Sequence, residues 1–250
     1  MDSNTKNIAI LVDGDNAQAK LLGNILEEVS TYGKVTIRRI YGDWTIPQMN
    51  SWKELLNDLS FTPIQKFNYT KGKNSTDSSL IIDAMDILYS EKVHGFCIVS
   101  SDSDYTGLAK RIREAGIFVM GIGEKKTPNA FVQSCEIFTY TETLAPEEPA
   151  KTKKTTSQKE GKQQEEKQED RKLTMKEIRL INKAFDMSAG EDDETYISVI
   201  GMNLRRLNSS FDARNYGYRN LTALFRSIST YEVVNNPEKG AKNRLIRRKS

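Results

Sequence analysis

Acidic residues follow two apolar segments of this 250-residue chain. Asp13 comes directly after the run 8–12, and Asp102 and Asp104 come shortly after the run 95–100. Carboxylates that gather in one crevice raise each other's pKa unless cations neutralise them. Ligand sets made only of oxygen suit hard divalent ions, so Mg²⁺ or Mn²⁺ is expected. Such an ion activates water and stabilises phosphoryl oxygens, and the pattern therefore indicates metal-assisted hydrolysis.

A third acid, Asp77, stands in the first turn of a helix predicted over 75–90. Each acid by itself has a structural alternative. Ser101 or Asp102 would cap the helix predicted over 106–115, and Asp77 would favour the positive end of its own helix dipole. The convergence of Asp13, Asp77 and Asp102 at one edge of a sheet favours a metal site instead.

The elements that position these acids alternate between strand and helix patterns. Strands are predicted over 7–12, 35–41, 62–67, 95–100 and 117–122, and helices over 16–30, 47–59, 75–90 and 106–115. This alternation predicts an α/β fold, a three-layer α/β/α sandwich around a mostly parallel sheet. The first and fourth strands are expected to be central neighbours. Sites in such sheets form beyond the carboxyl ends of the strands, which is where the acids stand.

Composition excludes several classes of protein. Hydrophobic residues make up 37% of the chain and charged residues 28%. The longest apolar runs are far shorter than the ~20 residues of a membrane helix. The chain has two Cys, one His and no CxxC pair, which argues against a disulfide scaffold or a zinc site. It has no glycine-rich nucleotide motif. The first residues show no signal-peptide pattern, so a cytoplasmic location is expected.

Charge and composition predict domains at 1–144 and 172–250, joined by a linker at 145–171. The linker contains no Leu, Ile, Val or aromatic residue and cannot form a core. Residues 171–250 carry 16 Lys and Arg against 9 Asp and Glu, a net charge of +7. Residues 1–144 carry 15 against 18, a net charge of −3. This asymmetry favours a polyanion as partner of the last part, although ordinary surface variation is the alternative.

Three motifs, in order, carry a family resemblance. They are Ile10-Leu-Val-Asp-Gly-Asp-Asn16, Lys71-Gly-Lys-Asn-Ser-Thr-Asp77 continuing to Asp86, and Val99-Ser-Ser-Asp-Ser-Asp-Tyr105. Together they resemble the NYN domain family, the PIN-like nuclease group, in its LabA-like or DUF88 branch. The resemblance covers roughly residues 6–144 and implies a metal-dependent endoribonuclease. It places metal-binding acids at Asp13, Asp77, Asp102 and Asp104, with Asn16 as a polar helper.

Basic residues near these motifs are candidates for contact with RNA. Lys71 and Lys73 precede Asp77 and are expected to contact phosphates that flank the cleaved bond, as are Arg38 or Arg39. A solvated surface is the alternative for each of them.

Two further acids are ambiguous. Asp83 stands six residues beyond Asp77, about 9 Å along a helix axis and off the face of Asp77, so it is interpreted as a supporting or structural residue. Asp15 is ambiguous because it need not point the same way as Asp13 at a strand end.

The last part combines helical patterns with a short β segment, which suggests a small winged-helix-like domain. The segment 201–224 resembles the OST-HTH/LOTUS domain, and the string Phe211-Asp-Ala-Arg-Asn-Tyr-Gly217 is characteristic of that family. The resemblance covers about 172–248 and implies RNA binding or docking of a protein partner. The basic residues expected to contact RNA are Arg205, Arg206, Arg214 and Arg219, with further charge from Arg244, Arg247, Arg248 and Lys249 in the tail.

The leading hypothesis is a ribonuclease that cleaves single-stranded or structured RNA, with the LOTUS domain holding the substrate. Two alternatives stay open. One is a non-catalytic RNA-binding or protein-docking scaffold. The other is a haloacid-dehalogenase-like phosphatase, because Asp13-Gly-Asp15 is similar to the nucleophile pair of that family. Ala17, where that family has Thr or Val, and the motif around Asp77 count against the phosphatase.

Overall fold

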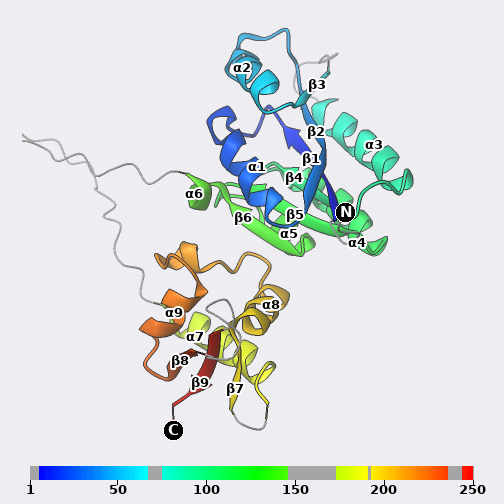
Figure 1. Ribbon diagram of the computed structural model, residues 1–250. Helices are drawn as coiled ribbons and strands as arrows, with labels where there is room; N and C mark the ends of the chain where they lie inside the picture. Colours follow the sequence, from blue (N-terminus) through cyan, green and yellow to red (C-terminus); the bar gives the residue numbers. More distant parts are fainter. Residues whose placement is uncertain (1–5, 67–74, 146–172, 191–192, 236–243, 250) are drawn as a thin grey trace, which may run out of the picture. The chain divides into compact units, whose positions relative to one another are not determined.

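The computed structural model describes residues 6–66, 75–145, 173–190, 193–235 and 244–249 (Figure 1). The side chains of residues 75–77 and 235 are not described. Contacts between residues divide the chain into two compact units, one made of 1–144 with 201–211 and one of 145–200 with 212–250. The linker predicted at 145–171 lies outside the described residues except for its first residue. None of the described helices is both long enough and apolar enough to span a membrane.

A six-stranded sheet lies at the centre of the first unit, and every neighbouring pair of its strands is parallel. The strands are β1 (Asn7–Asp13), β2 (Lys34–Gly42), β3 (Thr62–Gln65), β4 (Gly95–Val99), β5 (Phe118–Gly123) and β6 (Ile137–Tyr140). Their order is β3-β2-β1-β4-β5-β6. The predicted adjacency of the first and fourth strands is confirmed, because β1 pairs with both β2 and β4. The ends of β1 and β4 therefore meet at the same edge.

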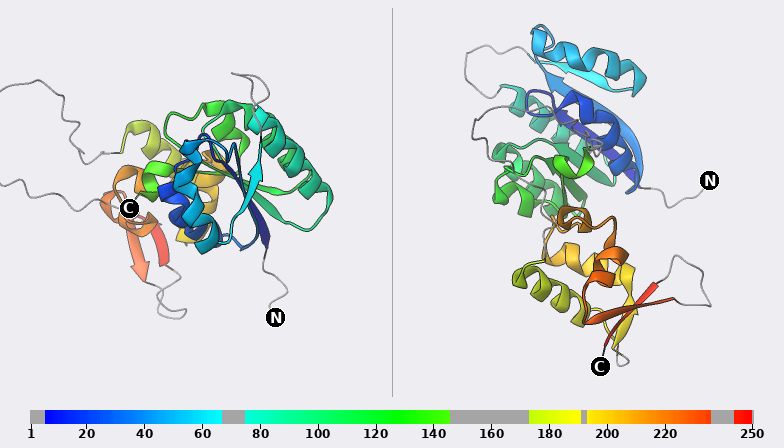
Figure 2. Two further views of the ribbon diagram at one scale, coloured as in Figure 1. Left: turned by 90° about the horizontal axis from the view of Figure 1, so that it is seen from above. Right: turned by 90° about the vertical axis from the view of Figure 1, so that its left-hand side faces the viewer.

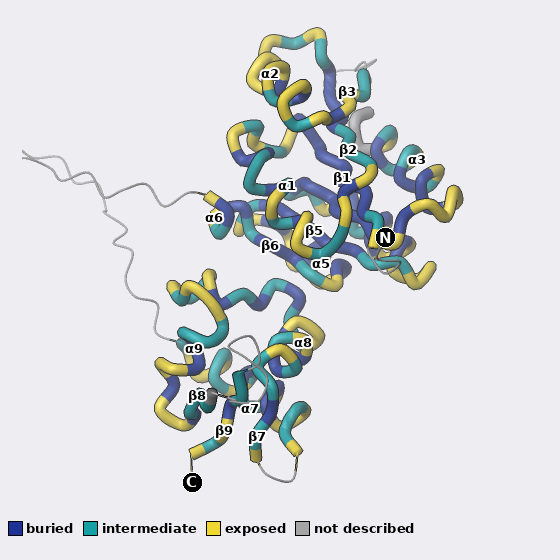
Figure 3. Tube along the Cα trace, viewed as in Figure 1, coloured by how far each residue is buried: buried dark blue, intermediate teal, exposed yellow. Residues whose placement is uncertain are grey.

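Helices cover both faces of this sheet, which confirms the three-layer α/β/α fold (Figure 2). The helices are α1 (Leu22–Ser30), α2 (Asn50–Asp58), α3 (Ser75–Tyr89), α4 (Thr106–Glu114), α5 (Asn129–Ser134) and α6 (Thr141–Leu144). One core lies between the sheet and α3, α4 and α5, and the other lies between the sheet and α1, α2 and α6. The central strands β1, β4 and β5 are buried almost throughout, whereas the edge strand β3 has no buried residue (Figure 3).

Strand alternation assigns each β1 side chain to one of the two cores. Ile8, Ile10 and Val12 pack with α1, whereas Ala9 and Leu11 pack with α3 and α4. Successive side chains of a strand point to opposite faces. Asp13 therefore belongs to the face of the sheet that α3 and α4 cover. Five of the six residues before it in β1 are apolar.

The elements begin and end close to their predicted positions, with differences at the site. The helix predicted over 16–30 starts later, with a 3₁₀ turn at Ala19–Leu21 before α1. A turn precedes it, in which the Ala17 N–H donates to the Asp13 carbonyl over 2.9 Å. The third strand ends at Gln65. A 3₁₀ turn at Ser103–Tyr105 precedes α4.

The second unit and the 201–211 segment supply the C-terminal elements, which are helices followed by a small antiparallel sheet. They are α7 (Met175–Asp186), β7 (Glu194–Tyr196), α8 (Ile197–Leu207), α9 (Leu221–Ser227), β8 (Tyr231–Asn235) and β9 (Arg244–Arg248). The strand order is β7-β9-β8, and both pairings are antiparallel. Thr174 and Glu177 form a capping box at the start of α7. These elements agree with the predicted small winged-helix-like domain.

Candidate active site at the carboxyl edge of the sheet

Asp13 is the most deeply buried acid at the carboxyl edge of the described sheet. Its exposed fraction is 0%, and three donors surround its carboxylate. The Asp15 N–H donates to Oδ1 over 3.3 Å, and Asn16 Nδ2 and Ser100 Oγ donate to Oδ2 over 2.7 and 2.9 Å. A buried carboxylate needs such partners, because its charge is costly to desolvate. The hydrogen bond from Asn16 to the Asp13 carboxylate is the contact that a polar helper of Asp13 would make.

Gly14 allows the chain to turn immediately after Asp13. A Cβ atom at this position would lie 2.8 Å from the Tyr41 carbonyl oxygen and 2.8 Å from Met49 Cε. The Gly14 N–H also donates to the Tyr41 carbonyl over 2.8 Å. Close approach of two backbones requires glycine, so this part of the acidic motif has a packing reason.

Ser100 joins the end of β1 to the acidic segment after β4. Its hydroxyl donates to Asp13 and accepts a hydrogen bond from the Asp102 N–H over 3.0 Å. Sequence reasoning assigned Ser100 no role. The available signal was a serine that ends an otherwise apolar strand. The Ser100 hydroxyl therefore links the Asp13 carboxylate to the backbone N–H of Asp102.

Asp102 also caps the turn that follows it. Its Oδ1 accepts a hydrogen bond from the Asp104 N–H over 2.9 Å at the start of the 3₁₀ turn. Asp102 thus caps the 3₁₀ turn and not α4 itself, whose N-cap residue Tyr105 makes no side-chain capping hydrogen bond. A carboxylate has two oxygens with about four lone-pair sites, so a cap does not exclude a second role. Asp104 itself is exposed to solvent.

Asp77 lies in the first turn of α3, as predicted, but its side chain is among those not described. Lys71 and Lys73 lie outside the described residues. Among the side chains that are described, no group of three His, Cys, Asp or Glu is close enough to hold a metal ion. The carboxylates of Asp13 and Asp102 offer only oxygen atoms, and this donor type suits Mg²⁺ or Mn²⁺.

Other polar groups at this edge have structural partners. The Glu124 carboxylate, after β5, accepts a hydrogen bond from Gln18 over 3.1 Å and pairs with Lys126 over 2.6 Å. These contacts lower the pKa of Glu124, with Lys126 as the largest cause. Asp43, after β2, accepts hydrogen bonds from Thr45, which lower its pKa. Sequence reasoning missed both acids.

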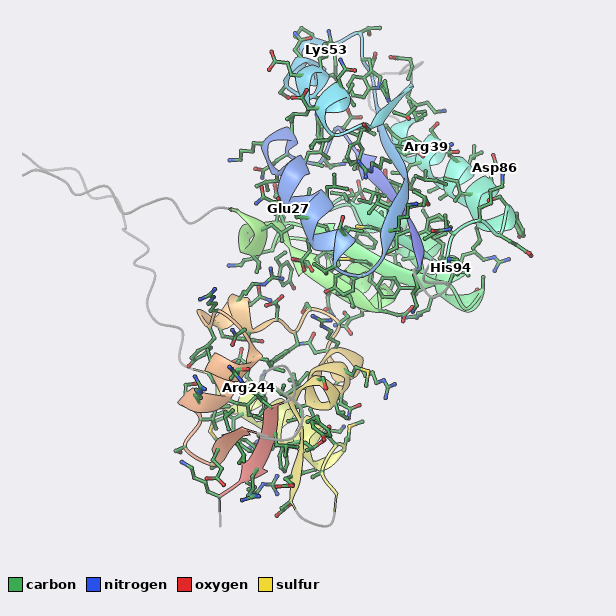
Figure 4. The ribbon with its side chains drawn as sticks, viewed as in Figure 1. Glu27, Arg39, Lys53, Asp86, His94 and Arg244 are labelled. Atoms are coloured by element: carbon green, nitrogen blue, oxygen red, sulfur yellow. The ribbon has the colours of Figure 1, made fainter. Side chains whose placement is uncertain are left out.

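Arg39 and Asp83 form an ion pair between β2 and α3, and the Tyr41 hydroxyl donates to the same carboxylate. Figure 4 shows Arg39 on β2 beside α3. These contacts agree with the interpretation of Asp83 as a supporting or structural residue. Arg38 donates to the Leu59 carbonyl over 2.8 Å. Both arginines proposed to contact phosphate therefore have partners inside the domain.

His94, Cys97 and Cys135 have structural contacts, which agrees with the absence of a His or Cys catalytic pattern in the sequence. His94 precedes β4, and its Nδ1 accepts a hydrogen bond from the Asn7 N–H over 3.1 Å (Figure 4). Cys97 and Cys135 are buried in the two cores. Burial raises the pKa of Cys135 to about 12, so its thiol stays protonated and is a poor nucleophile.

Several basic residues of the C-terminal part are held in ion pairs. Arg214 contacts both carboxylate oxygens of Asp212 at 3.1 Å or less. Arg248 pairs with Asp186 over 2.5 Å, and its guanidinium lies 4.9 Å from the centre of the Phe185 ring. Arg247 pairs with Glu194 over 2.6 Å. Arg219 is exposed, and Arg206 donates to Asn203 over 3.4 Å.

The fold and the acids at the edge of its sheet define a parallel α/β domain with a candidate carboxylate site. Comparison with family models identifies the family of this domain. The family model of the NYN domain matches residues 7–142, more than half of the chain. The chain belongs to the NYN domain family, which is part of the PIN-like nuclease superfamily. The model of the OST-HTH/LOTUS domain matches residues 168–241. The two families, in this order, support a role in RNA binding and nuclease chemistry.

Two of the solved structures that match the chain each cover just over half of it. A protein of unknown function from Vibrio parahaemolyticus has 21% sequence identity and a TM-score of 0.47, covering 56% of this chain and 95% of its own. MurG from Acinetobacter baumannii has 13% identity and a TM-score of 0.37, covering 54% of this chain and 40% of its own. No curated protein matches the chain.

Proposed function

We propose that the chain is a metal-dependent endoribonuclease that hydrolyses RNA phosphodiester bonds. Its catalytic domain is residues 1–144, and a linker at 145–171 leads to an RNA-binding LOTUS domain at 172–250. One observation carries the proposal: the Ser100 hydroxyl contacts both the fully buried Asp13 carboxylate and the backbone of Asp102. One side chain thus links the acid at the end of β1 to the acidic segment that follows β4, which supports a shared site at this edge of the sheet.

Helical periodicity supports Asp77 as the third acid. Position 77 lies three residues before Leu80 and seven before Ala84, and both of these residues are fully buried against the sheet. Residues spaced by three and seven share one face of a helix. In a parallel β-α-β connection, the helix begins at the carboxyl edge of the sheet. Position 77 therefore belongs to the sheet-facing side of α3, on the face of the sheet to which Asp13 belongs.

We assign the metal to Asp13, Asp77 and Asp102, with Asp104 bound through water or orienting the nucleophile. PIN-like nuclease domains generally use divalent metal ions, and the all-oxygen donor set fits Mg²⁺ or Mn²⁺. When bound, such an ion supplies charge neutralisation for the carboxylates and Lewis acidity at the phosphate.

The chain's own residues prepare this site and hold the substrate. Asn16 and Ser100 fix the orientation of the Asp13 carboxylate, because both donate to its Oδ2. Lys71 and Lys73 contact flanking phosphates in this proposal. The LOTUS domain binds RNA through basic residues such as Arg205, Arg206 and Arg219, and tethering raises the substrate concentration near the acids. A protein partner of the LOTUS domain and a cytoplasmic location stay predictions.

Asp102→Asn tests the proposal most sharply, because an asparagine side chain still offers an oxygen to the Asp104 N–H and preserves the cap. Cleavage of labelled single-stranded and structured RNA would be compared with Mn²⁺, with Mg²⁺ and with chelator. Wild type is expected to cleave only with metal, and Asp102→Asn is expected to lose about 100-fold or more of the rate. Asp86→Asn, on the exposed side of α3 (Figure 4), removes the same charge and is expected to cleave normally.

Two other results would overturn the proposal. If wild type and Asp102→Asn both bind RNA and neither cleaves it, the chain is a non-catalytic RNA-binding scaffold. If a chromogenic phosphate monoester is hydrolysed and Asp13→Asn abolishes this turnover, the chain is a phosphatase.

A further inference from the structure

A polar cluster made of Arg39, Tyr41 and Asp83 connects the sheet to α3. Arg39 Nη1 contacts Asp83 Oδ1, and the Tyr41 hydroxyl donates to Asp83 Oδ2. The Tyr41 ring is fully buried, whereas the side chains of Arg39 and Asp83 are exposed by 32% and 24%. One carboxylate on the helix thus receives two directed hydrogen bonds from one strand.

The register of the sheet places this cluster next to the candidate active site. Tyr41 pairs with Asp13, and Arg39 pairs with Leu11, in the β1–β2 ladder. Tyr41 packs in the same core as Leu11, so it belongs to the same face of the sheet as Asp13. Asp83 is six residues, or about 9 Å of helix, beyond Asp77. The cluster therefore joins α3 to β2 beside Asp13, about two helical turns from the first turn of α3, which carries Asp77.

Apolar contacts also join α3 to the sheet. Leu80, Ala84, Ile87 and Leu88 pack against the sheet through apolar contacts. The hydrophobic effect is non-directional, so it favours burial of this helix face as a whole. Hydrogen bonds to a carboxylate are directional and strong. The hydrogen bond with Asp83 is the largest cause that raises the pKa of Arg39, so the guanidinium stays charged at neutral pH.

We infer that Arg39, Tyr41 and Asp83 are positioning residues that fix α3 on β2 and thereby set Asp77 against Asp13. This inference rests on the proposed metal site. None of the three touches the metal or the RNA in this assignment. Their effect is to hold two acids from separate elements at the separation that one cation requires.

Tyr41→Phe is the informative variant, because it keeps the buried ring and removes only the hydroxyl. Mn²⁺ affinity of the full chain would be measured without RNA, by calorimetric titration and by the electron paramagnetic resonance signal of free Mn²⁺. Tyr41→Phe is expected to weaken Mn²⁺ binding about tenfold. Asp83→Asn is expected to weaken it further, because it also removes the charge that faces Arg39.

Ile87→Val provides the matched control on the same helix. Ile87 is buried in the α3 core, and this change deletes one methyl group without touching the polar cluster. It destabilises the packing of α3 by an amount comparable to a lost hydrogen bond. Ile87→Val is expected to bind Mn²⁺ like wild type. Tryptophan fluorescence would confirm that every variant is folded, since Trp44 and Trp52 both lie in the first unit.

The outcomes separate this inference from the proposed function. If wild type binds no Mn²⁺, the metal site itself is wrong and the inference falls with it. If wild type binds Mn²⁺ and Tyr41→Phe binds it within about twofold of wild type, the site stands and the positioning role is wrong. Equal losses for Tyr41→Phe and Ile87→Val would also overturn the positioning role, because general loosening of α3 would then explain both.

Discussion

Replacing Ser100 by alanine tests the link between the two strand ends directly. The exposed fraction of Ser100 is 2%, and the substitution removes one oxygen without adding volume. The lost hydrogen bond to the charged Asp13 carboxylate is worth about 1.5–3 kcal/mol, and the lost bond from the part-buried Asp102 N–H about 0.5–1.5 kcal/mol. Ser100→Ala is therefore expected to lower the free energy of unfolding by about 2–4 kcal/mol.

Ser134→Ala is the matched control for this prediction. Ser134 is exposed by 1%, and its hydroxyl donates to the neutral Phe131 carbonyl over 2.7 Å within α5. Its loss is expected to be about 0.5–1.5 kcal/mol, because no charged group loses a partner. Urea unfolding followed by tryptophan fluorescence reports on the unit concerned, since both tryptophans of the chain lie in it.

Equal destabilisation by the two substitutions would refute this prediction. If Ser100→Ala is no more destabilising than Ser134→Ala, the Ser100 hydroxyl does not support a charged carboxylate. Asp13 and Asp102 would then lack the connection on which the candidate site depends.

Two further predictions concern acid stability and RNA binding. Hydrogen bonds lower the pKa of Asp43 in the folded state, so its contribution to stability is present above the unfolded pKa of about 3.9 and is lost as pH falls through the lower folded value. The urea midpoint of Asp43→Asn is expected below that of wild type near neutral pH and should approach it in acid; parallel pH curves would contradict this. For RNA, Arg219→Ala should reduce the slope of log affinity against log salt by about 0.7, the value for one phosphate contact with a single strand. Arg214→Ala is expected to change the slope less, because Arg214 is paired with Asp212, and equal changes would contradict this.

The order of the elements was predictable because local patterns determine it. Apolar runs such as 8–12 and helical periodicity over 75–90 depend only on neighbours in the chain, and the structure has β1 and α3 there. The adjacency of β1 and β4 was expected because both strands were predicted to be central in the sheet. The acids could therefore be placed at one sheet edge without coordinates. The start of α1 was predicted too early, because the turn after Asp13 has no signal in apolar periodicity.

The choice between a cap and a site could not be made from sequence, and the two are compatible in Asp102. One of its oxygens accepts the Asp104 N–H, while its own N–H contacts Ser100. The pattern that predicts a cap and the pattern that predicts a ligand are the same short string. Only the place of Asp13, which comes from another strand, distinguishes a cap from a ligand.

The sequence by itself determined the class of fold, the two domain families and the edge of the sheet to which Asp13 and Asp102 belong. The tertiary structure alone decided which side chains meet there. Ser100 and Asp13 are 87 positions apart, and Tyr41 and Asp83 are 42 apart. Whether such pairs face each other depends on strand register and on the seating of a helix. A shift of one residue in a strand would turn Tyr41 or Asp13 to the opposite core, and no local pattern records that shift.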